Sequence, residues 1–202
     1  KIKLTKGELK RQRDALRQYE RYLPTLQLKK QQLQLEILRQ LAILEEREHQ
    51  FALKEKSAES WAQVLSEGLL KLEWLLPKNV ATSGKNIAGV DIPIFERVDF
   101  DVAEYDLFTT PLWVDAAIES LRHLISLQEE LKTIQRGIEI LRQELRITTQ
   151  RVNLFEKVKI PQAKEIIRLI KIYLGDQLTN AVGRSKIAKA KIQEGLLEEV
   201  LA

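Results

Sequence analysis

Apolar residues recur at alternating steps of three and four along two long stretches of the chain, Leu9 to Leu75 and Leu124 to Tyr173. This period keeps one stripe of a helix facing a partner helix, so each stretch is typical of a coiled coil. The two stretches flank a segment of different character. We therefore predict an all-α-dominated fold, a long antiparallel two-helix coiled coil (a helical hairpin) with a short β-hairpin segment at its turn end.

Signals at the ends of the two stretches set the expected boundaries. Thr5 followed by Glu8 matches a capping box, which predicts the start of the first helix. Pro77 ends the first stretch, because the residue before a proline is pushed out of helical geometry. The predicted division is an N-terminal long helix in 1–77, a connecting segment with a short β-hairpin in 78–111, a C-terminal long helix in 112–175 and a basic, partly helical tail in 176–202.

Periodicity also predicts how the two helices pair. In an antiparallel pair the register that places Leu9 opposite Tyr173 also places Phe51 opposite Leu131. Pro24 and Pro161 lie inside the two runs. A proline removes one backbone donor, so a bend is expected in the first helix and an interruption in the second.

The connecting segment has β-type composition. Between Ile87 and Phe100, β-branched and aromatic residues accompany Gly89 and Pro93. This pattern predicts two short strands, placed either around Glu96-Arg97 or on the two sides of Gly89. The preceding run, Val80 to Asn86, is turn-like in composition.

Charge is distributed unevenly along the chain. Residues 1–30 and residues 151–191 each carry ten bases against three acids, whereas residues 91–130 carry ten acids against two bases. In a hairpin both basic stretches meet at one end and the acidic stretch lies at the other. A binding role is expected for the basic end. An acidic protein surface is favoured over nucleic acid, because stacking aromatics are sparse and no nucleic-acid motif is present.

Composition argues against an enzyme. The chain has no cysteine and two histidines, His49 and His123, which are expected to be surface or seam-edge residues. No metal site, cofactor site or catalytic residue is predicted, and Ser83 to Asn86 lacks the upstream glycine of a phosphate loop. No secretory signal or membrane-length apolar run is present, so direct membrane insertion is not expected.

Three tryptophans, Trp61, Trp74 and Trp113, are expected near the turn end of the hairpin. They would either thicken the core where the β-element packs or form an interface for a partner.

Two runs resemble a known family. Leu4-Thr5-Lys6 with Arg13-Asp14-Ala15-Leu16, and Arg151-Val152-Asn153-Leu154-Phe155-Glu156 followed by Ile160-Pro161, are similar to the long helices of the D subunit of V-type (A/V-type) ATPases and ATP synthases. The second run is the more specific match. The order of elements agrees over essentially the whole chain, and the similarity is greatest to bacterial members.

This resemblance implies a non-catalytic central-stalk rotor that transmits torque between the catalytic hexamer and the membrane ion-translocating ring. The implied partners are the A and B subunits of the hexamer, the small F subunit of the stalk and the coupling subunit of the membrane ring, with no nucleic acid and no cofactor. The implied location is cytoplasmic, peripheral to the inner face of the cell membrane. A freestanding coiled-coil scaffold or a nucleic-acid-binding helical rod is the alternative.

Candidate contact residues follow from the charge pattern and the resemblance together. The expected hexamer contacts are basic residues near the two chain ends: Lys6, Lys10, Arg13, Arg17, Arg168 and Lys171. The expected contacts with the F subunit are apolar residues near the turn end: Trp74, Ile87, Ile92 and Phe95.

Overall fold

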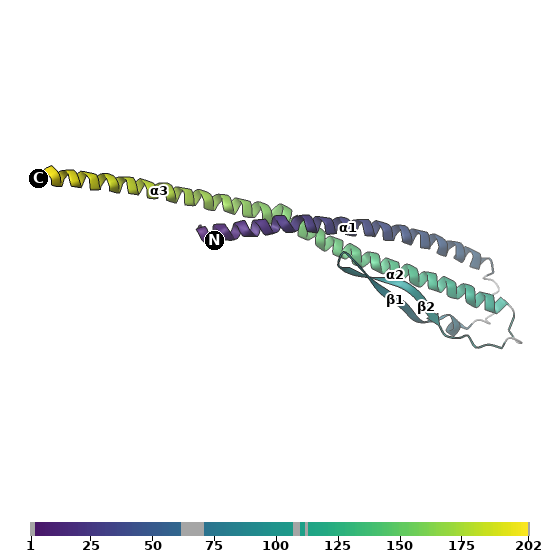
Figure 1. Ribbon diagram of the computed structural model, residues 1–202. Coiled ribbons are helices and arrows are strands. Elements are labelled where there is room, and N and C mark those ends of the chain that lie inside the picture. Colours follow the sequence, from purple (N-terminus) through teal and green to yellow (C-terminus); the bar gives the residue numbers. More distant parts are fainter. Residues whose placement is uncertain (1–2, 62–70, 107–109, 112, 202) are drawn as a thin grey trace. The chain divides into compact units, whose positions relative to one another are not determined.

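The computed structural model describes residues 3–61, 71–106, 110, 111 and 113–201, with side chains given up to residue 193. Its elements are α1 (Lys6–Glu59), the 3₁₀ helix η2 (Leu72–Leu75), β1 (Pro77–Ile87), β2 (Val90–Phe100), α2 (Trp113–Asn153), the π-helix η3 (Leu154–Lys159) and α3 (Ile160–Leu201) (Figure 1). Long helices with one short antiparallel sheet confirm the predicted fold class. The chain divides into a central unit, Leu28–Thr149, and a terminal unit, Lys1–Gln27 with Gln150–Ala202.

The first helix begins where its capping signal predicts. The Glu8 N–H donates to Thr5 Oγ1 at 3.3 Å, and the Leu9 N–H donates to the Thr5 carbonyl at 3.0 Å. The Thr5 side chain therefore satisfies one of the N–H groups that every helix start leaves without an intrahelical partner, and the Thr5 carbonyl accepts the first intrahelical bond.

The sheet is a two-stranded hairpin that turns at Ala88-Gly89. Both residues have positive φ, 52° and 77°, and Asn86 Oδ1 accepts the Gly89 N–H at 3.1 Å. Positive φ at both central positions is the turn geometry that matches strand twist. The prediction of a strand on each side of Gly89 is confirmed. The alternative turn at Glu96-Arg97 is wrong, as is the turn-like assignment of Val80 to Asn86, which lies within β1.

The core of the central unit lies where the hairpin turn meets both helices. Leu33 and Ile37 of α1, Leu141 of α2, and Val90 and Ile92 of β2 form one buried cluster. Figure 1 shows the hairpin running beside α2. A two-stranded ribbon is marginal alone in water, so this packing supplies what the hairpin needs to be stable.

Two ion pairs connect α1 and α2 in the same unit. Lys29 Nζ lies 3.0 Å from Glu144 Oε1, and Arg47 Nε lies 2.9 Å from Glu130 Oε1. The predicted register would instead place Gln135 opposite Arg47. The antiparallel pairing is therefore present in this unit, but the partners of Arg47 and Lys29 lie five and nine residues from the predicted positions. This is a shift of about one and a half to two and a half helical turns.

In the terminal unit α1 pairs, around Tyr19 and Glu20, with η3 and the start of α3. The rings of Tyr19 and Phe155 lie 5.3 Å apart, and Lys164 Nζ lies 3.4 Å from Glu20 Oε1. The buried residues of this unit come from the second half of the chain: Val152, Ala163, Ile167 and Ile170.

The predicted interruption at Pro161 is a widened turn of helix. In η3 the Ile160 N–H donates to the Phe155 carbonyl, five residues back, immediately before the proline. Pro161 has no N–H to continue the ordinary ladder, and a π-turn accommodates it without ending the helix. The expected end at Gly175 and Asp176 is wrong, because α3 continues through them to Leu201. The expected partly helical tail is thus a continuation of α3.

Candidate partner-binding surfaces

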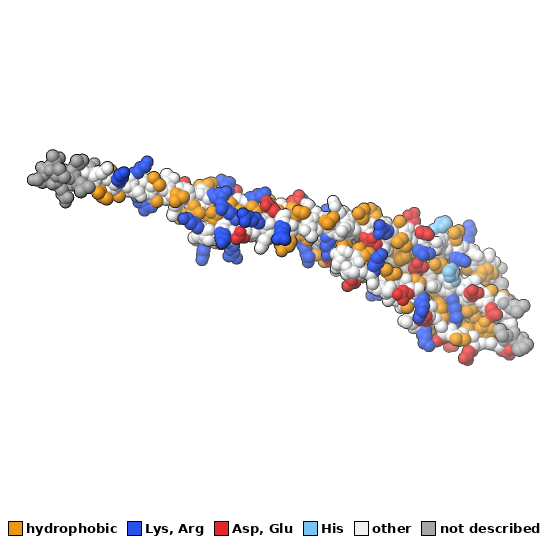
Figure 2. Space-filling model, viewed as in Figure 1, with side chains coloured by type: hydrophobic (Ala, Val, Ile, Leu, Met, Phe, Trp, Pro, Cys, Tyr) orange, Lys and Arg blue, Asp and Glu red, His pale blue; other side chains and the backbone are white. Residues whose placement is uncertain are grey.

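Four of the predicted basic residues share one face of α1. Lys6, Lys10, Arg13 and Arg17 follow steps of three and four and are all exposed. Together with Leu9 and Asp14 they line one shallow depression of about 250 Å³. We call these four residues the basic stripe. Figure 2 shows lysines and arginines, in blue, gathered over this part of α1 and the neighbouring stretch of α3.

The two predicted basic residues of α3, Arg168 and Lys171, are also exposed. Arg168 is held by its own helix, since Nε and Nη2 donate to the two carboxylate oxygens of Glu165 at 2.9 and 2.7 Å. This fork-to-carboxylate bond lowers the pKa of Glu165 and raises that of Arg168. The charge of Arg168 is therefore partly compensated, and the basic stripe is the stronger attraction for an acidic partner.

The later part of α3 has no partner within the described chain. Every residue from 171 to 193 is exposed except the half-buried Leu174. Large apolar side chains are exposed on it: Ile172, Leu178, Val182, Ile187 and Ile192. Helices gain most of their stability in proteins from packing one face, so this length of helix needs a surface that another molecule provides.

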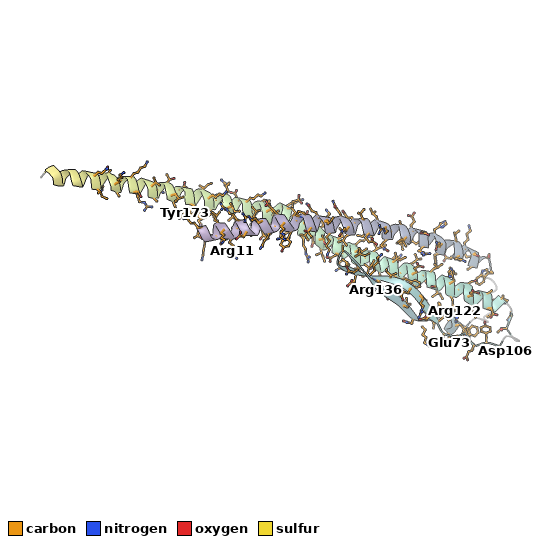
Figure 3. The ribbon with its side chains drawn as sticks, viewed as in Figure 1. Arg11, Glu73, Asp106, Arg122, Arg136 and Tyr173 are labelled. Atoms are coloured by element: carbon orange, nitrogen blue, oxygen red, sulfur yellow. The ribbon has the colours of Figure 1, made fainter. Side chains whose placement is uncertain are left out.

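A cluster at the open end of the hairpin fixes it to α2. Arg122 donates from Nε and Nη2 to the Trp74 carbonyl at 3.0 and 2.8 Å, and from Nη2 to the Asp101 carbonyl at 2.5 Å. Its guanidinium also lies 5.1 Å from the centre of the Phe100 ring. One side chain thus holds the segment before β1 and the segment after β2, and Figure 3 shows Arg122 at this place on α2.

The Trp74 ring extends the same cluster. It lies 5.4 Å from the ring of Tyr105, whose hydroxyl donates a short hydrogen bond to Asp115 Oδ1. This bond raises the pKa of Tyr105, because losing the proton would place two negative charges side by side. We call Trp74, Asp101, Tyr105, Asp115 and Arg122 the hairpin-base cluster.

The four predicted contacts for the F subunit occupy different environments. Ile92 is 3% exposed inside the core, and Ile87 packs partly buried against that core. These two side chains hold the hairpin turn on the helices, and Ile92 leaves almost no surface for a partner in this chain. Trp74 and Phe95 are half-buried and keep part of their surface accessible.

Arg122 is not among the contact residues that the sequence predicts. A signal was present, since Arg122 and Arg97 are the two bases in the acidic stretch 91–130. The target of Arg122 is backbone carbonyl oxygen, which carries no sequence signature.

Two further properties concern only the residues that the structure describes. Among them, no three histidine, cysteine, aspartate or glutamate side chains gather where a metal ion could bind. None of the described helices combines the length and apolar character needed to cross a membrane.

Comparisons with known proteins agree over nearly the whole chain. The family model of the ATP synthase D subunit matches residues 8–190. A Borreliella burgdorferi protein described as the D subunit of V-type ATP synthase is 48% identical over 197 residues, 95% of this chain and 95% of that protein. Proteins of the same description from Chlamydia trachomatis and Chlamydia muridarum are 33% and 34% identical, each over 96% of this chain and 97% of the relative.

Proposed function

Because the chain belongs to the family of the ATP synthase D subunit, it is a central stalk component of a V-type ATP synthase, and we propose that it transmits torque between the catalytic hexamer and the membrane ring of that complex. In this proposal the chain performs no chemistry. ATP is bound and hydrolysed or made by other subunits. Rotation of the chain couples those steps to ion movement.

The exposed helix of residues 171–193 carries the proposal. Its apolar side chains are not packed against any other part of the described chain. The basic stripe adds positive charge in the same unit. A socket with apolar walls and acidic rims would satisfy both features. We assign this socket to the hexamer of A and B subunits, with Lys6, Lys10, Arg13, Arg17, Arg168 and Lys171 as its contacts.

Two further partners, the F subunit together with the coupling subunit of the membrane ring, are proposed to bind near the hairpin-base cluster. Trp74 and Phe95 are the predicted contacts that retain accessible surface, while Ile87 and Ile92 support them from the core. Through these partners the complex would sit at the inner face of the cell membrane.

Torque requires that α1 and α2 do not slide past each other. In the central unit the ion pairs Lys29–Glu144 and Arg47–Glu130 cross between the two helices, and Leu33 and Leu141 are both 0% exposed in the seam. Interlocked side chains of this kind resist axial movement, because sliding would unpack the core and separate the charges. A freestanding scaffold or nucleic-acid-binding rod would need the same stiffness, but the relatives are stalk subunits.

Charge reversal tests the socket. In the reconstituted complex, Lys10→Glu with Arg13→Glu should weaken association with the A and B subunits by about tenfold or more, and should flatten its salt dependence. Lys132→Glu with Arg136→Glu is the matched control, because both side chains are exposed on α2 in the other unit. Equal affinity and equal salt dependence for both variants would show that the basic stripe is not part of the interface with the A and B subunits.

Removal of an aromatic contact tests the second site. Phe95→Ala should reduce co-purification of the F subunit, whereas Leu72→Ala, at a side chain that is 75% exposed and outside the predicted contacts, should leave it unchanged. Undiminished co-purification with the Phe95 variant would show that Phe95 is not part of the interface with the F subunit.

A further inference from the structure

The buried seam in the second half of the chain changes phase at η3. Before η3 the buried side chains follow steps of three and four, with the half-buried Leu145 among them: Ile138, Leu141, Thr148 and Val152. The same steps continue to the half-buried Phe155 and would then reach Lys159 and Gln162, which are both exposed. The buried residues after η3 each lie one position beyond this series, and we call them the packed face: Ala163, Ile167 and Ile170.

The π-turn takes up this extra residue. In η3 the Ile160 N–H donates to the Phe155 carbonyl, five residues back instead of the usual four. The half-buried side chains of the same two residues are successive members of the seam, where its period requires a step of four. A widened turn holds one residue more than an α-helical turn, so the helix beyond it is turned back by about 100°. The π-turn therefore sets which face of α3 lies against α1 in the terminal unit.

Helix α3 also has apolar residues that match the phase of the seam before η3. Ile166, Leu169 and Tyr173 follow steps of three and four, and we call them the second face. Leu169 is 45% exposed and Tyr173 is 39% exposed, although both positions would lie on the seam if η3 were ordinary α-helix (Figure 3). The sequence thus supplies apolar residues for two registers of α3 on α1, which differ by one residue.

Pro161 favours the register that contains the π-turn. In an α-helix the ring of a proline collides with the carbonyl four residues before it, here that of Lys157. The π-turn widens the helix immediately before Pro161 and so relieves this collision. The second register would also bring the polar Lys159 and Gln162 onto the seam. Both effects make the second register the minor one in the isolated chain.

We propose that η3 is a register switch. In the first register η3 is a π-turn and the packed face lies on α1. In the second, η3 is ordinary α-helix, α3 is turned by about 100° on its own axis and moved by about 1.5 Å along it, and the second face lies on α1. Two packings of one sequence that differ little in free energy are what such a switch requires.

This inference deepens the proposed function and rests on it only for the load that operates the switch. A partner that grips α3 beyond residue 171 and twists it does work through the angle that separates the two registers. A load changes the populations of two states only through such a difference between them. The socket of A and B subunits would thereby populate the second register during ATP turnover.

Distances between two spin labels test the switch. The chain has no cysteine, so Arg11→Cys with Asp176→Cys places one label on α1 and one on α3, both at exposed positions. In the isolated chain we expect one main distance. Pro161→Ala should raise the ratio of a second distance to the first by about tenfold or more, because the proline no longer opposes the α-helical turn. Arg11→Cys with Gln150→Cys is the matched control, since Gln150 precedes η3 and its distance from Arg11 should stay the same.

Removal of one residue separates a register change from simple loosening of the helix. Deletion of Glu156 in the Pro161→Ala variant takes away the extra residue, so a continuous α-helix then places the packed face on α1. The first distance should return as the main one. A second distance that persists after the deletion would show loosening and overturn the inference, as would a single distance that Pro161→Ala leaves unchanged.

The assembled complex gives an independent result. With the labels at positions 11 and 176, samples frozen during ATP turnover should show both distances, and samples without ATP only the first. One distance in both conditions would contradict the inference. The effect of Pro161→Ala in the isolated chain does not depend on rotation. A chain that shows this effect but does not rotate in the complex would therefore overturn the proposed function alone.

Discussion

At the scale of single residues, Arg122 has the widest effect on local structure. It joins α2 to the carbonyls of Trp74 and Asp101 and covers the Phe100 ring. Trp74 and Asp101 flank the hairpin and Phe100 is the last residue of β2, so one side chain fixes the open end of both strands against α2. The guanidinium is suited to this task, because its planar fork presents several donors in fixed directions.

Substitution of Arg122 should loosen the open end of the hairpin. Arg122→Leu is expected to lower the free energy of unfolding of the chain by about 1–3 kcal/mol, since charged hydrogen bonds are lost and two carbonyls lose a donor. Arg122→Lys should recover part of this loss, because the charge is kept and the fork is not. Urea unfolding together with hydrogen exchange of β1 and β2 measures both effects.

Arg97 is the matched control for Arg122. It is paired with Asp99 at 3.1 Å but is 74% exposed, so Arg97→Leu should change stability by less than about 0.5 kcal/mol. Equal losses for the Arg97 and Arg122 variants would contradict the clamp assigned to Arg122.

Tyr105 gives a pH-dependent signal from the same cluster. Its pKa is raised from the usual 10.0, mainly by its hydrogen bond to Asp115. A raised pKa means that this contact contributes to stability below pH 10 and is lost as the pH rises through the higher value. Spectroscopic titration of the tyrosines should show one late component in the native chain. Asp115→Asn should return it to an earlier pH, and a titration unchanged by that substitution would show that the bond does not control Tyr105.

At the scale of elements, local periodicity explains what the sequence could predict. The three-four spacing predicts the two long helices, and the Thr5 capping box predicts the start of the first, since both signals act within a few turns. The expected ends differ from the structure, because α1 ends at Glu59 and not at Pro77, and α3 continues past Gly175. The register was missed because neighbouring heptad positions are nearly equivalent until cross-helix pairs such as Arg47–Glu130 select one. Residues 83–86 were missed as strand because their composition suits a turn, while their partners in β2 impose an extended form.

The residues of the candidate binding surfaces were less predictable from the sequence than the helices were. The basic stripe followed from charge and helical spacing alone, so its residues were placed together correctly. Ile92 was assigned to a partner because an apolar strand residue is equally suited to a core or an interface. Only the position of the hairpin against α1 and α2 decides between these, and no local signal encodes it.

Two neighbouring leucines of α1 test which face is the core. Leu33 is 0% exposed and Leu35 is 68% exposed. Leu33→Ala should lower the free energy of unfolding of the isolated chain by about 2–5 kcal/mol, because it leaves a cavity. Leu35→Ala should change it by less than about 0.5 kcal/mol. Thermal or urea unfolding of the two variants measures the difference, and similar losses would contradict the assignment of faces.

At the scale of the whole molecule, the chain has surfaces that it does not cover itself. The apolar residues of α3 beyond 171, the basic stripe and three leucines of α1 (Leu28, Leu35 and Leu38) are all exposed in the described chain. Exposed apolar and basic surfaces of this kind add little to the stability of a chain that functions without partners. A stalk subunit enclosed by partners accounts for all three.

Hydrogen exchange should show whether a partner protects the exposed part of α3 in the complex. In the isolated chain the backbone N–H groups of residues 171–193 should exchange rapidly, because no packed face protects them. In the assembled complex their exchange should slow by about tenfold or more, while residues 134–148 of α2 stay protected in both states. Strong protection of 171–193 in the isolated chain, or none in the complex, would contradict the proposed socket.

Rotation is the most direct test of the central claim. The chain has no cysteine, so Lys85→Cys at an exposed position of β1 provides one attachment point for an optical probe. With the A and B hexamer immobilised, single-molecule observation should show the probe turning in one direction when ATP is added and stopping when it is withdrawn. A probe that stays at a fixed angle while the same hexamer hydrolyses ATP would contradict the account.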